Sequence, residues 1–319
     1  MGLILMKEIR GMTTWEKDEQ GRLLACKVGK HNVLPTVYGD FVPRYSGPDF
    51  RRRDRAALTF YANGSVRGLE LEAASAVSTL AGTWEAEYLA FHEDGSLSAL
   101  FPRNGQLNFA WSEEDEGNIV PVYDFSFPFG SFRAKIISMR FFPSGSLRVV
   151  TLWPDERIEL TTPVGRIPVR IGFRLHEDGR LAAVEPASPV AVRTPIGEVT
   201  AYHPLALGLD AGQGSLQFDP QGNLLSLATV GGVEIRNRQT GTPERLRSPQ
   251  GMDLSECSVS DSLRIRFAAG DVYLDDGAEK RYALDAYNFY PYFDIRAGQG
   301  FSCSGDCEGC AASDMDESR

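Results

Sequence analysis

A pattern of nine residues recurs along the chain and constrains its fold more than any other feature. It reads apolar, any residue, Phe, three residues, Gly, any residue, Leu. Alternating apolar residues place one face of a strand against a core, and the three residues before the Gly form turns while the Gly supplies a positive φ. Each copy therefore predicts a β-hairpin. The copies are Leu58–Val66, Leu89–Leu97, Ala99–Leu107, Met139–Leu147, Phe173–Leu181 and Leu216–Leu224.

A second pattern, Thr-Pro-x-Gly-x-apolar, alternates with the first. Thr162–Ile167 and Thr194–Val199 are near copies of it. Pro as the second and Gly as the fourth of four residues are typical of a turn. We expect these turns at the end of the strands opposite to the turns of the first pattern. Looser copies are Thr36–Phe41, Thr79–Trp84 and Phe127–Phe132, and Ser248–Gly251 is interpreted as a decayed sixth.

The two patterns together predict an all-β fold, a repetitive antiparallel β-meander of hairpin repeats that forms a curled or solenoid-like sheet. A six-bladed β-propeller is the alternative. We expect one β-hairpin repeat domain over residues 1–297, with about six units from 36 to 297, and a flexible Cys-rich acidic tail over 298–319. The aromatic or leucine positions of the hairpins should be buried at Phe60, Phe91, Phe141, Leu175 and Phe218.

Three of the hairpin segments carry a family resemblance. Phe60–Val66 (FYANGSV), Phe91–Leu97 (FHEDGSL) and Phe141–Leu147 (FFPSGSL) resemble the Y-x-x-x-G-x-L half of the membrane occupation and recognition nexus (MORN) repeat, particularly its variant form in bacterial proteins. The glycine-rich Y-x-G-x-W half of that repeat is absent here. The resemblance implies a scaffold or interaction role, with a protein partner, rather than chemistry.

Charge and hydropathy exclude some classes of partner. The chain has 33 Lys and Arg against 43 Asp and Glu, a formal net charge of −10. Nucleic acid and anionic membranes attract positive charge, so neither is expected as a partner. The basic run Arg51–Arg55 and the acidic run Glu113–Glu116 are both predicted to be solvated loops. Few apolar residues precede the first charges, which is too short for a secretory signal, and we expect a cytoplasmic protein.

A cysteine cluster near the C-terminus is the strongest local chemical signal. Cys303, Cys307 and Cys310 have the spacing C-x3-C-x2-C. Closely spaced thiolates can surround one soft metal centre, so the spacing predicts zinc or an iron–sulfur cluster. A fourth ligand would come from Cys26, Cys257, a nearby carboxylate or a partner. The alternative is a mobile tail that carries free thiols.

An aromatic segment, Tyr287–Phe293, precedes this cluster. Its aromatic residues hold no single clean alternation, and Pro291 is expected to interrupt any strand. We expect the segment to cover the last sheet edge or to form a docking patch.

The common catalytic motifs G-x-S-x-G, G-x-x-x-x-G-K-[ST] and H-E-x-x-H are absent from the sequence. The sequence therefore favours a non-enzymatic repeat scaffold or binding module with a metal- or thiol-bearing tail. Two alternatives remain open. One is a redox or metal accessory protein. The other is a propeller-type hydrolase, because Phe218–Leu224 is similar to the F-D-x-x-G-N-L segment of lactonase-like and NHL propellers.

Overall fold

The structure is a computed structural model that describes residues 9–208, 214–248 and 262–293. Over half of these residues lie in strands, and the one α-helix among them is α1 (Glu113–Ile119). The all-β prediction is confirmed. The chain divides into two compact units, one built mainly from residues 1–184 and the other mainly from the residues after 184. In the part of the chain that the structure describes, no helix is long and apolar enough to span a membrane.

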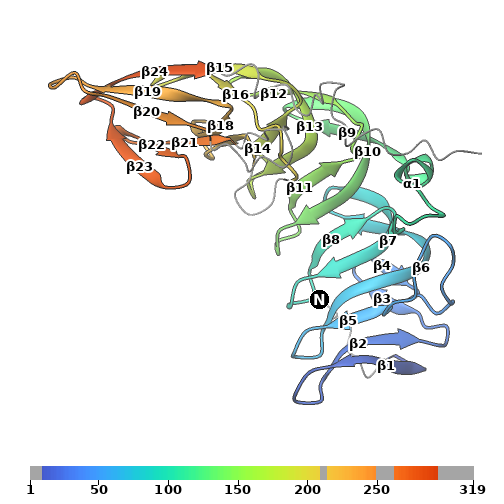
Figure 1. The fold of residues 1–319 in the computed structure, drawn as a ribbon. Helices are drawn as coiled ribbons and strands as arrows, with labels where there is room; N and C mark the ends of the chain where they lie inside the picture. Colours follow the sequence, from blue (N-terminus) through green and yellow to red (C-terminus); the bar gives the residue numbers. More distant parts are fainter. Residues whose placement is uncertain (1–8, 209–213, 249–261, 294–319) are drawn as a thin grey trace, which may run out of the picture. The chain divides into compact units, whose positions relative to one another are not determined.

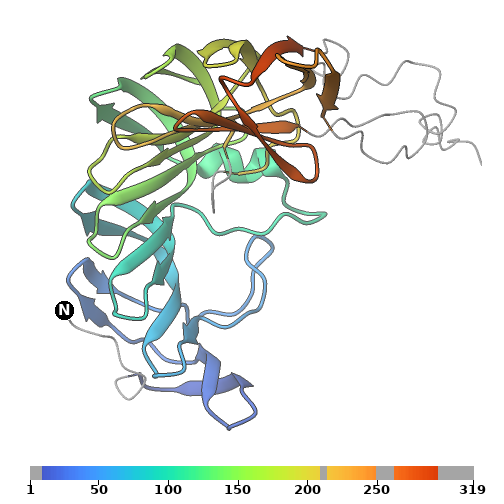
Figure 2. The same cartoon turned by 90° about the vertical axis from the view of Figure 1, so that its left-hand side faces the viewer.

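Most of unit 1 is one antiparallel sheet whose strands follow one another in chain order (Figures 1 and 2), and the third and fourth strands of the unit form a separate hairpin. Its strands are β1 (Met12–Lys17), β2 (Leu23–Val28), β3 (Leu34–Thr36), β4 (Gly39–Phe41), β5 (Leu58–Phe60), β6 (Val66–Thr79), β7 (Gly82–Phe91), β8 (Leu97–Phe101), β9 (Val122–Phe127), β10 (Gly130–Phe141), β11 (Leu147–Leu152), β12 (Ile158–Thr162) and β13 (Gly165–Leu175). One ladder runs β1–β2–β5–β6–β7–β8–β10–β11–β13. A propeller would split these strands into separate four-stranded blades, so the propeller alternative is wrong for this unit.

The register of this ladder places one residue from each strand in a row across the sheet. Because successive residues of a strand point to opposite faces, two adjacent rows belong to opposite faces. From β2 to β13 the first row lies in the core, and each of these residues is 0% exposed: Cys26, Leu58, Leu69, Leu89, Leu100, Met139, Val150 and Phe173. On β1 the row ends in the exposed Thr14. The second row begins Glu16, Ala25, Thr59, Gly68, Ala90 and Ala99. The second face therefore carries small side chains where the first carries large ones.

The hairpin turns of the first pattern share one hydrogen-bond arrangement. In the hairpin from β5 to β6, the N–H of Tyr61 donates to Ser65 O and the N–H of Gly64 donates to Tyr61 O. The same arrangement recurs at His92, Phe142 and His176, and the four turn glycines have φ between 82° and 87°. The expected burial is also confirmed, since each of the five hairpin positions is at most 4% exposed: Phe60, Phe91, Phe141, Leu175 and Phe218.

Two segments differ from the hairpins that the sequence predicts. Residues Asp18–Arg22 form the same turn between β1 and β2, with Lys17 in place of the Phe. By contrast, Ala99–Leu107 is not a hairpin, and the strand ends at Phe101. In the regular copies the residue after the Phe position donates its N–H across the turn. Here that residue is Pro102, which has no N–H to donate.

The turns of the second pattern depend on their Thr. Its hydroxyl donates to the carbonyl of the Gly three residues later, at Thr36, Thr79, Thr162 and Thr194. This bond closes the turn from within and explains why Thr recurs there. Ser248 is different, because its hydroxyl bonds to Gly231, which lies far from it in sequence. The rest of the proposed sixth copy lies outside the described residues.

Unit 2 contains smaller antiparallel sheets. Its strands are β15 (Val190–Thr194), β16 (Gly197–Ala201), β17 (Leu216–Phe218), β18 (Leu224–Thr229), β19 (Gly231–Asn237), β20 (Pro243–Arg247), β21 (Leu263–Ala268), β22 (Asp271–Asp275), β23 (Glu279–Ala283) and β24 (Tyr287–Phe293), and β14 (Leu181–Pro186) lies where the chain passes between the units. The Asp219 carboxylate accepts both the N–H and the side-chain amide of Asn223. The propeller-like segment is thus a hairpin turn closed by its own Asp and Asn.

The aromatic segment is a regular strand, contrary to the prediction that Pro291 would interrupt it. β24 pairs with β19 throughout its length, with Pro291 opposite Val233. Among the described strands β24 is at the edge of its sheet, in the order β20-β19-β24. An edge strand tolerates Pro because one side of it needs no N–H donor. The expectation that this segment covers a sheet edge is consistent with its pairing to β19.

Candidate functional site

A loop of unit 1, residues 42–56, lies against β6 and contains the whole basic run Arg51–Arg55; it is named the strap here. The N–H of Arg44 donates to Glu70 O and the N–H of Glu72 donates to Val42 O. The Glu72 carboxylate accepts the N–H groups of Tyr45 and Ser46. Although its partial burial opposes this, these bonds lower the pKa of Glu72. The strap is therefore bound to the sheet by both main-chain and side-chain contacts.

The prediction that Arg51–Arg55 is a solvated loop is wrong for Arg51, Arg52 and Arg55, whose side chains are largely buried. The Glu70 carboxylate is 1% exposed and binds two guanidinium groups of the strap, Arg44 Nη1 at 2.9 Å and Arg55 Nε at 2.9 Å. Arg44 is 5% exposed and also donates to three carbonyls of its own loop. Arg52 donates to the carbonyls of Leu71 and Glu72. These contacts bind the arginines of the strap to β6, whereas the arginines of a solvated loop would be surrounded by water.

The acidic run is likewise not a solvated loop. It forms α1, with Ser112 as the N-cap and Asp115 completing a capping box. Glu116 is 4% exposed and accepts the N–H of Gly105 and the indole N–H of Trp111. Its carboxylate also lies 3.3 Å from Arg51, which makes a bidentate pair with Glu87. Although burial opposes the shift, the bonds to Glu87 raise the pKa of Arg51.

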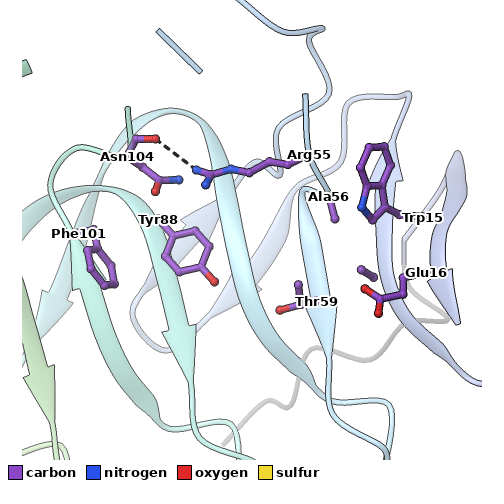
Figure 3. A pocket seen from close by; sticks show the side chains of 9 residues that line it. Trp15, Glu16, Arg55, Ala56, Thr59, Tyr88, Phe101 and Asn104 are labelled. Carbon is purple, nitrogen blue, oxygen red and sulfur yellow. Dashed lines mark hydrogen bonds between the residues drawn. The ribbon is translucent and has the colours of Figure 1, made fainter. Parts of the chain in front are cut away.

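A pocket of about 420 Å³ lies beside the strap, on the face of the sheet that carries the small residues. Its lining residues are Trp15, Glu16, Ala25, Arg55, Ala56, Thr59, Tyr88, Phe101 and Asn104. Figure 3 shows Trp15 and Tyr88 on opposite sides, with Arg55 extending above and Thr59 below. Arg55 is held there because its Nε bonds to Glu70 and its Nη2 bonds to Asn104 O at 3.2 Å. The strap therefore forms one wall of the pocket.

Gly68 makes room for two of the side chains that line the pocket. This glycine has Thr59 and Ala90 as its neighbours in the row across the sheet. The Tyr88 hydroxyl and Thr59 Oγ1 occupy the space that a Cβ on residue 68 would need. The Tyr88 ring also packs edge-on against Phe101, with the ring centroids 5.7 Å apart. Burial raises the pKa of Tyr88, so its hydroxyl is protonated and can donate.

Several polar groups that line the pocket have no partner in the part of the protein that the structure describes. Among the described residues, none bonds to the carboxylate of Glu16, to Thr59 Oγ1 or to the Tyr88 hydroxyl. Arg55 uses Nε and Nη2 in its contacts with the protein, which leaves its Nη1 for another acceptor. Trp15 is 48% exposed, and the Nζ of Lys27 lies 4.2 Å from the centre of its ring. An aromatic pocket with a few unpaired polar groups is the usual form of a small-molecule site.

The predicted metal ligands Cys303, Cys307 and Cys310 lie outside the described residues, as does Cys257. Within the described ranges, no group of three or more His, Cys, Asp or Glu could hold a metal ion. Cys26 belongs to the buried core row, where burial raises the pKa of its thiol to about 11.

The sequence patterns singled out none of the residues that line this pocket as a site. Trp15 lies in a hairpin that the patterns missed, and Asn104 lies in the segment that they wrongly predicted to be a hairpin. A usable signal was present, since Gly68 interrupts a strand of otherwise larger residues, and an isolated strand Gly often marks a close approach.

Comparison of the chain with protein-family models, with curated proteins and with solved structures finds no match. The site must therefore be interpreted from its own geometry.

Proposed function

We propose that this chain is a non-enzymatic repeat scaffold that acts as a binding module, and that the pocket of unit 1 is its ligand site. The observation that carries the proposal is the pocket itself, a space of about 420 Å³ bounded by three aromatic side chains, by hydroxyl and carboxylate groups without a partner among the described residues, and by Arg55, whose Nη1 is not used in its contacts. Typical ligand pockets have volumes of about 300–1,000 Å³. The volume is at the lower end of that range and suits a small molecule.

Preorganisation of the walls supports the same proposal. Arg55 is held by its ion pair with the buried Glu70. The Tyr88 ring packs against Phe101, and its hydroxyl lies directly over Gly68. A wall that is ordered before the ligand arrives reduces the entropy lost on binding. The protein partner that the repeat resemblance implies stays a prediction.

The test uses a substitution that displaces two lining side chains. Gly68→Ala places a Cβ against the Tyr88 hydroxyl and Thr59 Oγ1, so these side chains must shift. Gly47→Ala is the matched control, because nothing lies within 4 Å of a Cβ at that strap position. Binding of a fragment library is measured by ligand-observed NMR, and the thermal midpoint of each variant by calorimetry.

We expect fragments that bind the wild-type chain to lose binding in Gly68→Ala and to keep it in Gly47→Ala. Equal binding to all three proteins, or no binding to the wild type, would contradict the proposed ligand site.

The metal-bearing tail is a separate part of the proposal, supported by the C-x3-C-x2-C spacing alone. Anaerobic purification followed by metal analysis tests it, with the chain ending at residue 297 as the control. Zinc or iron above the level in the control supports the metal site, and equal levels would leave a thiol-bearing tail.

A further inference from the structure

The pocket presents groups of opposite charge that the protein does not fully neutralise. Glu16 supplies a carboxylate, and among the described residues it forms no ion pair. Figure 3 shows this carboxylate directed toward Thr59, below the indole of Trp15. Arg55 supplies a guanidinium on the strap side, and its Nη1 bonds to no group among the described residues. The pocket therefore has an acceptor wall and a donor wall.

Two of the charged side chains that line the pocket are not fully paired. Arg44 and Arg55 share the single carboxylate of Glu70, which leaves one positive charge beside the pocket. Glu16 contributes one negative charge. A ligand with a net charge would leave one of the two groups opposite a like charge or without a partner. A ligand that carries one charge of each sign would pair with both groups through charge-assisted hydrogen bonds.

The neutral groups match the same kind of ligand. The Tyr88 hydroxyl and Thr59 Oγ1 lie close enough together to occupy one Cβ position over Gly68. Each can donate to a carboxylate or accept from an ammonium. The indole of Trp15 and the rings of Tyr88 and Phe101 provide apolar surface for the rest of the molecule.

We propose that the pocket of unit 1 binds a free α-amino acid with an apolar or aromatic side chain, with its ammonium at Glu16 and its carboxylate at Arg55. This inference rests on the proposed function, since it names the ligand class of the same pocket.

The experiment is calorimetric titration of the full chain with each of the twenty standard L-amino acids. For the amino acid that binds best, the analogue without the ammonium and the analogue without the carboxylate are titrated next. We expect each analogue to bind at least about tenfold more weakly than the amino acid, which corresponds to about 1.4 kcal/mol.

Variants separate the role of Glu16 from a general effect of charge. Glu16→Gln should weaken binding of the amino acid at least about tenfold and should leave the carboxylate-only analogue bound as well as before, or better. Glu19→Gln is the matched control, because Glu19 is exposed in the adjacent turn and does not line the pocket. Thr59→Val is a second variant, which removes a hydroxyl that has no partner among the described residues and should weaken binding without loss of the fold.

The outcomes distinguish this inference from the proposed function. If no amino acid binds while fragments still occupy the pocket, or if Glu16→Gln binds the amino acid as the wild type does, the amino-acid inference is overturned and the binding module stands. If neither amino acids nor fragments bind, both fail. Preferential binding of a neutral sugar would also overturn the inference.

Discussion

Arginine–carboxylate pairs occur in both units, but their surroundings differ. In the strap of unit 1, the side chains of Arg44 and Glu70 are 5% and 1% exposed. On β21 and β23 of unit 2, the side chains of Arg266 and Glu279 are 43% and 48% exposed, although the pair is bidentate with distances of 2.8 and 2.9 Å. Arg44 makes a single contact of 2.9 Å with Glu70, so the more exposed pair has the more extensive contact and the buried pair differs from it mainly in burial.

That difference has energetic and functional consequences. Removing one partner of a buried pair leaves an uncompensated charge, which typically costs about 3–5 kcal/mol, whereas exposed pairs contribute about 0–1 kcal/mol. The buried pairs of unit 1 hold the strap against β6 and place Arg55 beside the pocket. The exposed pair of unit 2 lies on strands that already pair through their backbones. The buried ion pairs of the strap position a loop, whereas the exposed Arg266–Glu279 pair lies on a sheet that is already held by backbone hydrogen bonds.

The largest effect is expected at Glu70. Glu70→Gln keeps the shape of the side chain but leaves Arg44 buried without a counter-charge. We expect the free energy of unfolding to fall by about 3–5 kcal/mol. Urea denaturation of the variant, followed by tryptophan fluorescence, measures it. A loss below about 1 kcal/mol would show that Arg44 is hydrated and that the strap does not bury its charges.

An intermediate effect is expected from acid. The pKa of Asp49 is lowered, because the N–H groups of Arg52 and Arg51 bond to its carboxylate despite opposing burial. The pKa of Glu72 is also lowered, because the N–H groups of Tyr45 and Ser46 bond to its carboxylate despite opposing burial. A carboxylate with a lowered pKa stabilises the folded strap above its unfolded pKa, and this stabilisation is lost as the pH falls through the folded value.

We therefore expect the amide NMR signals of Tyr45 and Ser46 to change at pH values below about 4, the ordinary range of Asp and Glu. The amides of β22 should change little over the same interval, since their partners are backbone carbonyls. Simultaneous changes in both regions would indicate global unfolding and contradict a local release of the strap.

The smallest effect is expected at Glu279. Glu279→Gln removes the carboxylate of an exposed pair, and Arg266 can remain in water and over the ring of Tyr273, 3.8 Å from its centre. We expect a change of about 0–1 kcal/mol in the free energy of unfolding, measured as for Glu70→Gln. A loss as large as that of the Glu70 variant would remove the contrast between the two regions.

The repeat could be predicted from sequence because its chemistry is local. A turn glycine such as Gly64 bonds within five residues, and so does each Thr of the second pattern. The strap could not be predicted, because its partners are distant. Arg51 meets Glu87 across 36 residues and Glu116 across 65. Charge runs such as Arg51–Arg55 look like solvated loops until the fold brings carboxylates to them.

One failure could have been avoided with the same local chemistry. Pro102 has no N–H to close its turn, and this alone was enough to reject the copy Ala99–Leu107. The segment that results is not a return strand, and it brings Asn104 to the pocket and Gly105 to Glu116.

The most direct test of the role of the buried charges is hydrogen–deuterium exchange of the strap amides, resolved by residue with NMR. We predict that Arg44, Tyr45 and Ser46 exchange slowly, near the rates of the β6 amides beside them, because their N–H groups bond to Glu70 O and to the Glu72 carboxylate. Glu70→Gln should speed this exchange, and Glu279→Gln should leave it unchanged. Exchange at the rate of an unstructured loop in the wild-type chain would contradict the claim that buried charges build the strap and the pocket beside it.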